Sequence, residues 1–219
     1  MNGASPFHFW HVPMEKAKRK EREFNLRRAD ILDAAVKIFA AKGFHNTTVA
    51  EIAASSGFAI GTLYQFFASK EHLYSALLAE RLTAMYADIR AAVAEASDVI
   101  GKIELLVSSQ FRYVEENADF CGIFVRGDYL SLSEGNAELR GRIRSDYARH
   151  VAFIEEVLAD GIRAGLIKEM DPTLMATALT GIINSYAAKW IALAEEGSLR
   201  EKTPHVLAIF LEGVKRDAR

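Results

Sequence analysis

The sequence predicts an all-α protein that consists of a small N-terminal head and a larger helical body. Apolar residues recur at helical spacing through most of the 219 residues, and only four of those residues are proline. From Ser69 onward no pair of alternating segments predicts a strand pair. We therefore expect a tail and basic arm over residues 1–24, a head over 25–72, and a body over 73–219.

The first predicted helix runs from Asn25 to Lys42. Four apolar residues, Ile31, Ala35, Ile38 and Phe39, fall at i, i+4, i+7 and i+8, which places them on one helix face. Gly43 follows Lys42 and ends the pattern. This stretch predicts an amphipathic helix with one buried face.

Two short helices follow the first one. Thr48 and Glu51 have the S/T-x-x-E spacing of a capping box, in which each residue satisfies a backbone amide of the other. Gly57 suits the left-handed residue that ends a helix. After a short turn, Gly61–Phe67 form the next helix. Together these segments predict a helix-turn-helix, whose second helix enters the DNA major groove.

The body is predicted to contain only helices. Ser69 caps a long helix, and Asp171 with Pro172 gives the N-cap and first-turn residues of another. The expected helices cover about residues 69–96, 99–116, a short one from 119, 138–164, 172–195 and 204–215, with a loop at 132–135.

Charge is unevenly distributed along the chain, although the net charge is only −2. The positive charge concentrates between Lys16 and Arg28, and the expected DNA-contacting arm comprises Lys18, Arg19, Lys20 and Arg22. Phosphate attraction needs a local basic patch rather than a basic protein. A solvated charge run beside a helix is the alternative interpretation.

The segments ILDAAVKIFAAKGFHNTTVAEIA and GTLYQFFASKEHL resemble the TetR family of transcriptional regulators. The resemblance is specific over about Arg28 to Leu78. It implies a homodimeric repressor that binds a palindromic duplex operator and is released by a small apolar or amphipathic effector. The alternative is a DNA-binding regulator without such an effector, either constitutive or controlled by a protein.

The resemblance also implies which head residues contact DNA. They are Thr47, Thr48, Ala59, Ile60, Gly61, Thr62, Tyr64, Gln65 and Lys70. Tyr64 and Lys70 are expected at phosphates. Ala59 departs from the family pattern because it lacks a capping hydroxyl, and Phe66 stands where a tyrosine is frequent. Direct base contacts are therefore expected to be few.

The body contains an aromatic cluster that predicts either an effector pocket or ordinary core. The candidate pocket residues are Phe111, Phe120, Phe124, Tyr129, Phe153 and Trp190. Candidate polar contacts are Gln110, Arg112, His150 and Asn184, although a histidine such as His150 is more often solvated or hydrogen-bonded. The resemblance implies a dimer interface on the last two helices, with Ile182, Tyr186, Leu207, Phe210 and Val214.

Other classes of protein are disfavoured. No G-x-S-x-G, P-loop, dinucleotide fingerprint or H-E-x-x-H indicates an enzyme or a cofactor, and Cys121 in its apolar segment is expected to be inert. His8 and His11 form too weak a pair for a metal site. Without a signal peptide or a bilayer-length apolar run, we expect a cytoplasmic protein that does not enter the membrane.

Overall fold

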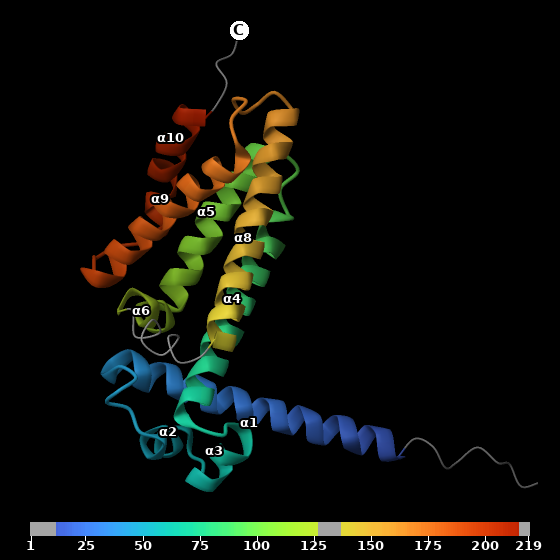
Figure 1. Ribbon diagram of the computed structural model, residues 1–219, viewed down its shortest axis with the longest axis vertical. Coiled ribbons are helices and arrows are strands. Elements are labelled where there is room, and N and C mark those ends of the chain that lie inside the picture. Colours follow the sequence, from blue (N-terminus) through green and yellow to red (C-terminus); the bar gives the residue numbers. More distant parts are fainter. Residues whose placement is uncertain (1–11, 127–136, 215–219) are drawn as a thin grey trace, which may run out of the picture. The chain divides into compact units, whose positions relative to one another are not determined.

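The N-terminal unit is a three-helix head. The computed structural model describes residues 12–126 and 137–214 (Figure 1). The head helices are α1 (Val12–Lys42), α2 (Val49–Ser56) and α3 (Ile60–Phe66). The chain divides into two compact units between Leu73 and Tyr74. Tail residues 1–11, including His8 and His11, lie outside the described residues.

Helix α1 begins at Val12, although the apolar pattern predicted a start at Asn25. Residues 14–24 are rich in Lys, Arg and Glu, which form helices well even without an apolar face. Arg19 and Glu23 form an i,i+4 ion pair with a 3.1 Å separation. The basic arm is therefore a helical extension, because intrinsic propensity continues the helix where amphipathic periodicity stops.

The predicted capping box of α2 is confirmed. The Thr48 hydroxyl accepts from the Glu51 amide at 3.2 Å, and the Glu51 carboxylate accepts from the Thr48 amide at 2.8 Å. Lys42 donates to the same carboxylate at 2.5 Å. The Lys42 ammonium and then the Thr48 donors lower the pKa of Glu51 to about 2. Gly57 ends α2 with a left-handed φ of 74°.

Helix α3 is fixed by packing rather than by a cap. Its N-cap residue Ala59 makes no side-chain hydrogen bond, because a methyl group cannot accept one. Leu63 and Phe67 are buried, and the guanidinium of Arg28 lies 5.1 Å from the Phe67 ring centroid. The rings of Phe24 and Phe66 lie 4.5 Å apart. Contacts with α1 therefore hold α3 where a capping hydroxyl is missing.

Helix α4 (Lys70–Val93) begins in the head and continues into the body. The predicted Ser69 cap is confirmed, because the Ser69 hydroxyl accepts from the His72 amide at 3.1 Å. The Nδ1 atom of His72 also accepts from the Ala68 amide at 3.1 Å. Two side chains thus satisfy amides at the start of this connecting helix.

The helices of the body largely follow the predicted ranges. They are α5 (Val99–Glu116), α6 (Ala118–Arg126), α8 (Ala137–Arg163), α9 (Pro172–Ala192), the 3₁₀ turn η1 (Arg200–Lys202) and α10 (Thr203–Val214). The Asp171 cap is confirmed by its 2.8 Å contact with the Thr173 amide. The predicted loop at 132–135 lies outside the described residues.

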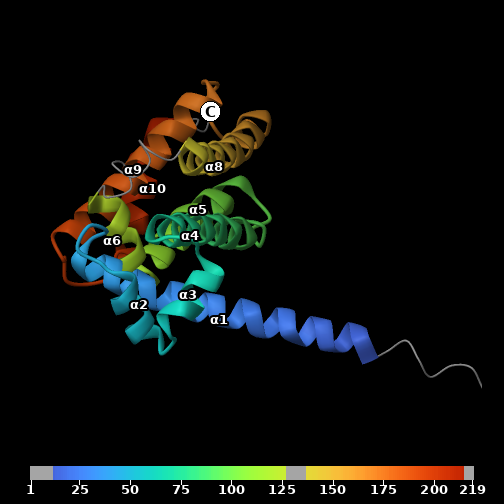
Figure 2. The ribbon, with the colours of Figure 1, turned by 60° about the horizontal axis from the view of Figure 1, so that its bottom comes forward.

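Helices α5, α8 and α9 pack against one another at the centre of the body. Helix α10 packs on α5, and α6 packs on α9 (Figures 1 and 2). Phe111, Leu158 and Ile183 are buried among them. Gly161 allows a close approach, since a Cβ at that position would lie 2.9 Å from Val99 Cγ1. Throughout residues 12–126 and 137–214, no helix is sufficiently long and apolar to cross a membrane.

Candidate nucleic-acid interface and effector site

One face of α3 is exposed to solvent. Ile60, Gly61, Tyr64 and Gln65 are exposed and share a helix face, while Leu63 faces the core. Tyr64 retains 53% of its accessible surface. A Cβ at Gly61 would meet nothing within 4 Å, so the backbone there can approach a partner closely. Thr62 is half-buried at the side of this face.

The two threonines before α2 have different environments. Thr48 is exposed, and its hydroxyl belongs to the capping box. Thr47 is buried, and its hydroxyl donates to the Gly43 carbonyl at 2.8 Å. The structure thus corrects the expectation of a phosphate contact from the Thr47 side chain, because that side chain faces inward.

Lys70 has structural contacts that the sequence does not reveal. Its ammonium donates to the carbonyls of Phe44 at 2.9 Å and Thr47 at 2.8 Å. It also lies 4.2 Å from the centroid of the Phe44 ring. Lys70 therefore holds the connection between α1 and α2 against the start of α4, and a phosphate contact would use its remaining N–H.

The basic residues of the arm are exposed on α1. Lys18, Lys20 and Arg22 are exposed, while Arg19 is paired with Glu23. Since exposed ion pairs are weak, Arg19 can still exchange its partner for a phosphate. The helical geometry distributes these charges around α1 instead of along an extended arm.

The predicted aromatic pocket consists of separate packing contacts in the described residues. Phe111 is fully buried with its ring 6.4 Å from that of Tyr186, and the rings of Phe120 and Phe124 lie 5.2 Å apart. Phe153 lies under the guanidinium of Arg90. The half-buried Trp190 donates its indole N–H to the Gly197 carbonyl at 3.1 Å. Tyr129 lies outside the described residues.

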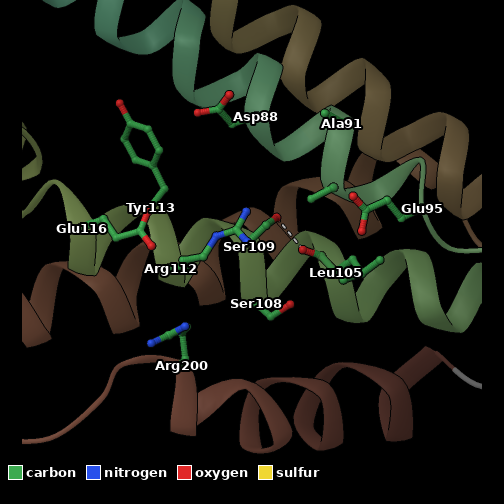
Figure 3. A pocket seen from close by; sticks show the side chains of 11 residues that line it. Asp88, Ala91, Glu95, Leu105, Ser108, Ser109, Arg112, Tyr113, Glu116 and Arg200 are labelled. Atoms are coloured by element: carbon green, nitrogen blue, oxygen red, sulfur yellow. Dashed lines mark hydrogen bonds between the residues drawn. The ribbon is translucent and has the colours of Figure 1, made fainter.

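A polar groove of about 570 Å³ lies in the body between α4, α5 and η1 (Figure 3). Its lining residues are Asp88, Ala91, Ala92, Glu95, Leu105, Ser108, Ser109, Arg112, Tyr113, Glu116 and Arg200. Three carboxylates outnumber two guanidinium groups, and Arg200 is also paired with Glu115 at 2.7 Å. This charge balance does not favour a phosphate-rich headgroup.

The sequence did not predict this groove, because its walls come from segments far apart in the chain. Glu115 on α5 holds the segment that includes η1 beside the groove. Its carboxylate accepts hydrogen bonds from the Ser198 hydroxyl at 2.6 Å and from the Arg200 amide at 3.1 Å. Neither contact has a local sequence pattern. Arg112, a candidate polar contact, does line the groove.

The residues expected at a dimer interface differ in exposure. Phe210 and Val214 are buried within the chain, with Phe210 only 4% exposed. Ile182, Tyr186 and Leu207 are half-buried. The strongly exposed apolar residues of α9 and α10 are instead Leu174 at 67% and Ile209 at 56%. Many apolar residues of these two helices therefore pack into the core of the chain.

Cys121 has the properties of an inert thiol. Burial raises the pKa of the Cys121 thiol to about 12, so the nucleophilic thiolate is scarce at neutral pH.

The chain matches two family models that together cover both units. The model for bacterial regulatory proteins of the tetR family matches residues 31–77, and the model for the C-terminal region of YsiA-like proteins matches residues 78–213. The second model alone covers more than half of the chain. The chain therefore belongs to the tetR family and is a DNA-binding transcriptional regulator, not an enzyme.

Several of the proteins similar to this chain are regulators named for fatty acid metabolism or as FadR. The fatty acid metabolism regulator protein of Bacillus subtilis is 26% identical over 185 residues, which cover 84% of this chain and 93% of that protein. The fatty acid degradation regulator FadR of Bacillus halodurans is 27% identical, with a TM-score of 0.75 over 85% of this chain and 95% of that chain. FadR from Bacillus subtilis, solved in complex with stearoyl-CoA, is 25% identical, with a TM-score of 0.74 over 84% and 98%.

Proposed function

We propose that this regulator is a homodimeric repressor that an amphipathic fatty acyl thioester releases from its operator. The observation that carries the proposal is the similarity to FadR from Bacillus subtilis, which spans head and body and was solved with stearoyl-CoA. An acyl thioester matches the apolar or amphipathic effector class that the sequence predicts. A regulator without a small-molecule effector remains the alternative.

The exposed side of α3 is proposed to enter the major groove. Tyr64 and Lys70 supply phosphate contacts, while Thr62 and Gln65 are available for base edges. Ile60 can contact a thymine methyl. The exposed Thr48 and the basic side chains of α1 add phosphate contacts around this helix.

Self-association is proposed on the exposed sides of α9 and α10. Leu174, Ala178, Gly181 and Ser185 are exposed and follow one helix face at i, i+4, i+7 and i+11. Nothing lies within 4 Å of a Cβ placed at Gly181, so a partner helix can approach there. Exposed Ile209 adds an apolar contact from α10. A twofold dimer would recognise a palindromic operator with half-sites about 34–36 Å apart.

The release mechanism is proposed to act through α4, because this helix is continuous from the head into the body. The effector must bind the DNA-incompetent state more tightly, since equal affinity for both states shifts no population. A tenfold loss of operator affinity requires about 1.4 kcal/mol of differential binding.

The proposal is tested with operators selected from a random duplex pool and measured by fluorescence anisotropy. Stearoyl-CoA should weaken operator binding at least tenfold, whereas free coenzyme A at equal concentration should not. Specific operator binding that no acyl thioester changes would favour the regulator without an effector. Failure to select any operator sequence would contradict the proposed repressor.

A further inference from the structure

His150 on α8 is a buried histidine without a hydrogen-bonding partner. The residue is 1% exposed, and its ring stacks on Tyr86 of α4 with centroids 4.3 Å apart and planes at 19°. Within the residues that the structure describes, neither ring nitrogen has a hydrogen-bond partner. His150 is thus neither solvated nor hydrogen-bonded, contrary to the interpretation that its sequence position favoured.

Charged groups near His150 already have other partners. Asp146 forms an ion pair with Arg149, and its second carboxylate oxygen lies 3.5 Å from the Thr83 hydroxyl. Arg90 of α4 donates to the Arg149 carbonyl at 2.9 Å, and its guanidinium lies over the Phe153 ring. These contacts leave the imidazole outside the hydrogen-bonded network of its neighbours.

Burial keeps the His150 imidazole uncharged. Loss of solvent, followed by the positive charge of Arg90, lowers the pKa of His150 to about 4. A neutral imidazole offers one N–H donor and one nitrogen acceptor. Leaving such groups unpaired is costly, so an unpaired buried polar atom in a native protein needs an explanation, such as a functional role.

A ligand group needs fewer polar neighbours at this position than a trapped water does. Buried water typically makes about three hydrogen bonds, whereas two charged neighbours of His150, Asp146 and Arg90, already have partners. A ligand group is held by the rest of its molecule and needs only one hydrogen bond to a ring nitrogen. The stacked Tyr86 ring also gives the site an aromatic wall.

We propose that one ring nitrogen of His150 forms a hydrogen bond, inside the body, with a neutral polar group of the effector. The inference rests on the proposed effector class and specifies one of its contacts. Two parts of a fatty acyl thioester have this chemistry: a secondary amide of the pantetheine arm and a hydroxyl on the acyl chain. Because the imidazole stacks on α4, a group bound there would also alter the packing of the helix that continues into the head.

The test replaces His150 by phenylalanine, which retains a ring for stacking and removes both nitrogens. The full-length H150F variant should melt at the same or a higher temperature than wild type without ligand, because it removes two unpaired buried groups. Its affinity for the relevant probe should nevertheless fall about tenfold, the equivalent of one lost hydrogen bond. H150N, which retains one donor and one acceptor, should recover part of that affinity.

Four probes distinguish the two sources of the bound group: stearoyl-CoA, 3-hydroxystearoyl-CoA, stearic acid and 3-hydroxystearic acid. Calorimetry measures each with wild type, H150F and the matched control H45F, which changes an exposed histidine of the head. Weaker binding of both thioesters by H150F, with both acids unchanged, assigns the amide. Loss in H150F of a wild-type preference for hydroxylated probes assigns the hydroxyl.

Two results would overturn the inference while leaving the proposed function intact. The first is equal binding of all probes by H150F and wild type, with operator release preserved. The second is a large fall in melting temperature for both H150F and H150N with no change in affinity, which would assign His150 a purely structural role. If wild type binds none of the probes, the proposed effector class and this inference both fail.

Discussion

The head and the body differ in where their functional candidates lie. In the head, Tyr64, Ile60 and Gln65 remain exposed on α3, and Leu63 alone of that helix is buried. In the body, Phe111 and Phe210 are buried by packing within the chain. A helix-turn-helix displays its function on a surface defined by local sequence, whereas a body site depends on contacts between distant helices.

The largest expected effect comes from a pair of variants that compare an exposed residue of the body with a buried one. Ile209→Glu places a charge on an exposed residue of α10 and should split the proposed dimer with the body still helical. Operator affinity should then fall on the order of 100-fold, because the two heads no longer bind as one unit. Light scattering and anisotropy measure both effects.

The matched variant Phe210→Glu changes the neighbouring residue, which is buried. An unpaired buried charge should cost several kcal/mol and unfold the body rather than dissociate it. If Ile209→Glu remains fully dimeric, the interface lies elsewhere. If Phe210→Glu remains folded, the assignment of Phe210 to the core is wrong.

A smaller effect distinguishes the two head residues that are predicted to contact DNA phosphates. Lys70→Ala should destabilise the protein by about 1–2 kcal/mol, because it removes two charged hydrogen bonds to the carbonyls of Phe44 and Thr47. Tyr64→Phe should leave stability within about 0.5 kcal/mol, since Tyr64 is exposed.

Both head variants should weaken binding to cognate and non-cognate duplexes alike, because phosphate contacts position the protein on DNA without specifying its sequence. Lys70→Ala should also flatten the salt dependence of binding by about one unit of slope. Denaturant unfolding and anisotropy titrations at several salt concentrations measure these outcomes. An unchanged slope would assign Lys70 a structural role only.

The smallest expected effect concerns the capping box. The pKa of Glu51 is lowered in the folded head, so its ionised form stabilises the head above its ordinary pKa of about 4.5. This contribution should disappear as the pH falls from about 4.5 to 2. Glu51→Gln should therefore lower the melting temperature at pH 7 but have no effect near pH 2. A difference that persists at pH 2 would contradict the role of the carboxylate charge.

Sequence patterns predicted the elements whose causes are local. Thr48, Gly57, Ser69 and Asp171 mark helix ends through side-chain caps or a left-handed residue, and the structure bears out each of them. The start of α1 was wrong because residues 14–24 form a helix by propensity without an apolar face. Periodicity alone cannot detect such a segment.

The body site could be predicted only as a set of candidate residues. The pattern that marks Phe111 as apolar is the same for a pocket wall and for core, and the contact with Tyr186 favours packing. The groove depends on Glu115 holding residues 198–200, a contact over more than eighty positions in sequence. His150 was visible as a candidate, but its lack of a partner is a tertiary property.

The central claim is that an effector bound to the body weakens DNA binding by the head, and reciprocity tests it most directly. We would measure the dissociation constant of stearoyl-CoA with and without saturating operator duplex, and that of the operator with and without saturating stearoyl-CoA. The account predicts that both constants rise by the same factor, at least about tenfold, because coupling between two sites is thermodynamically mutual. Two constants that are unchanged by the other ligand would contradict it.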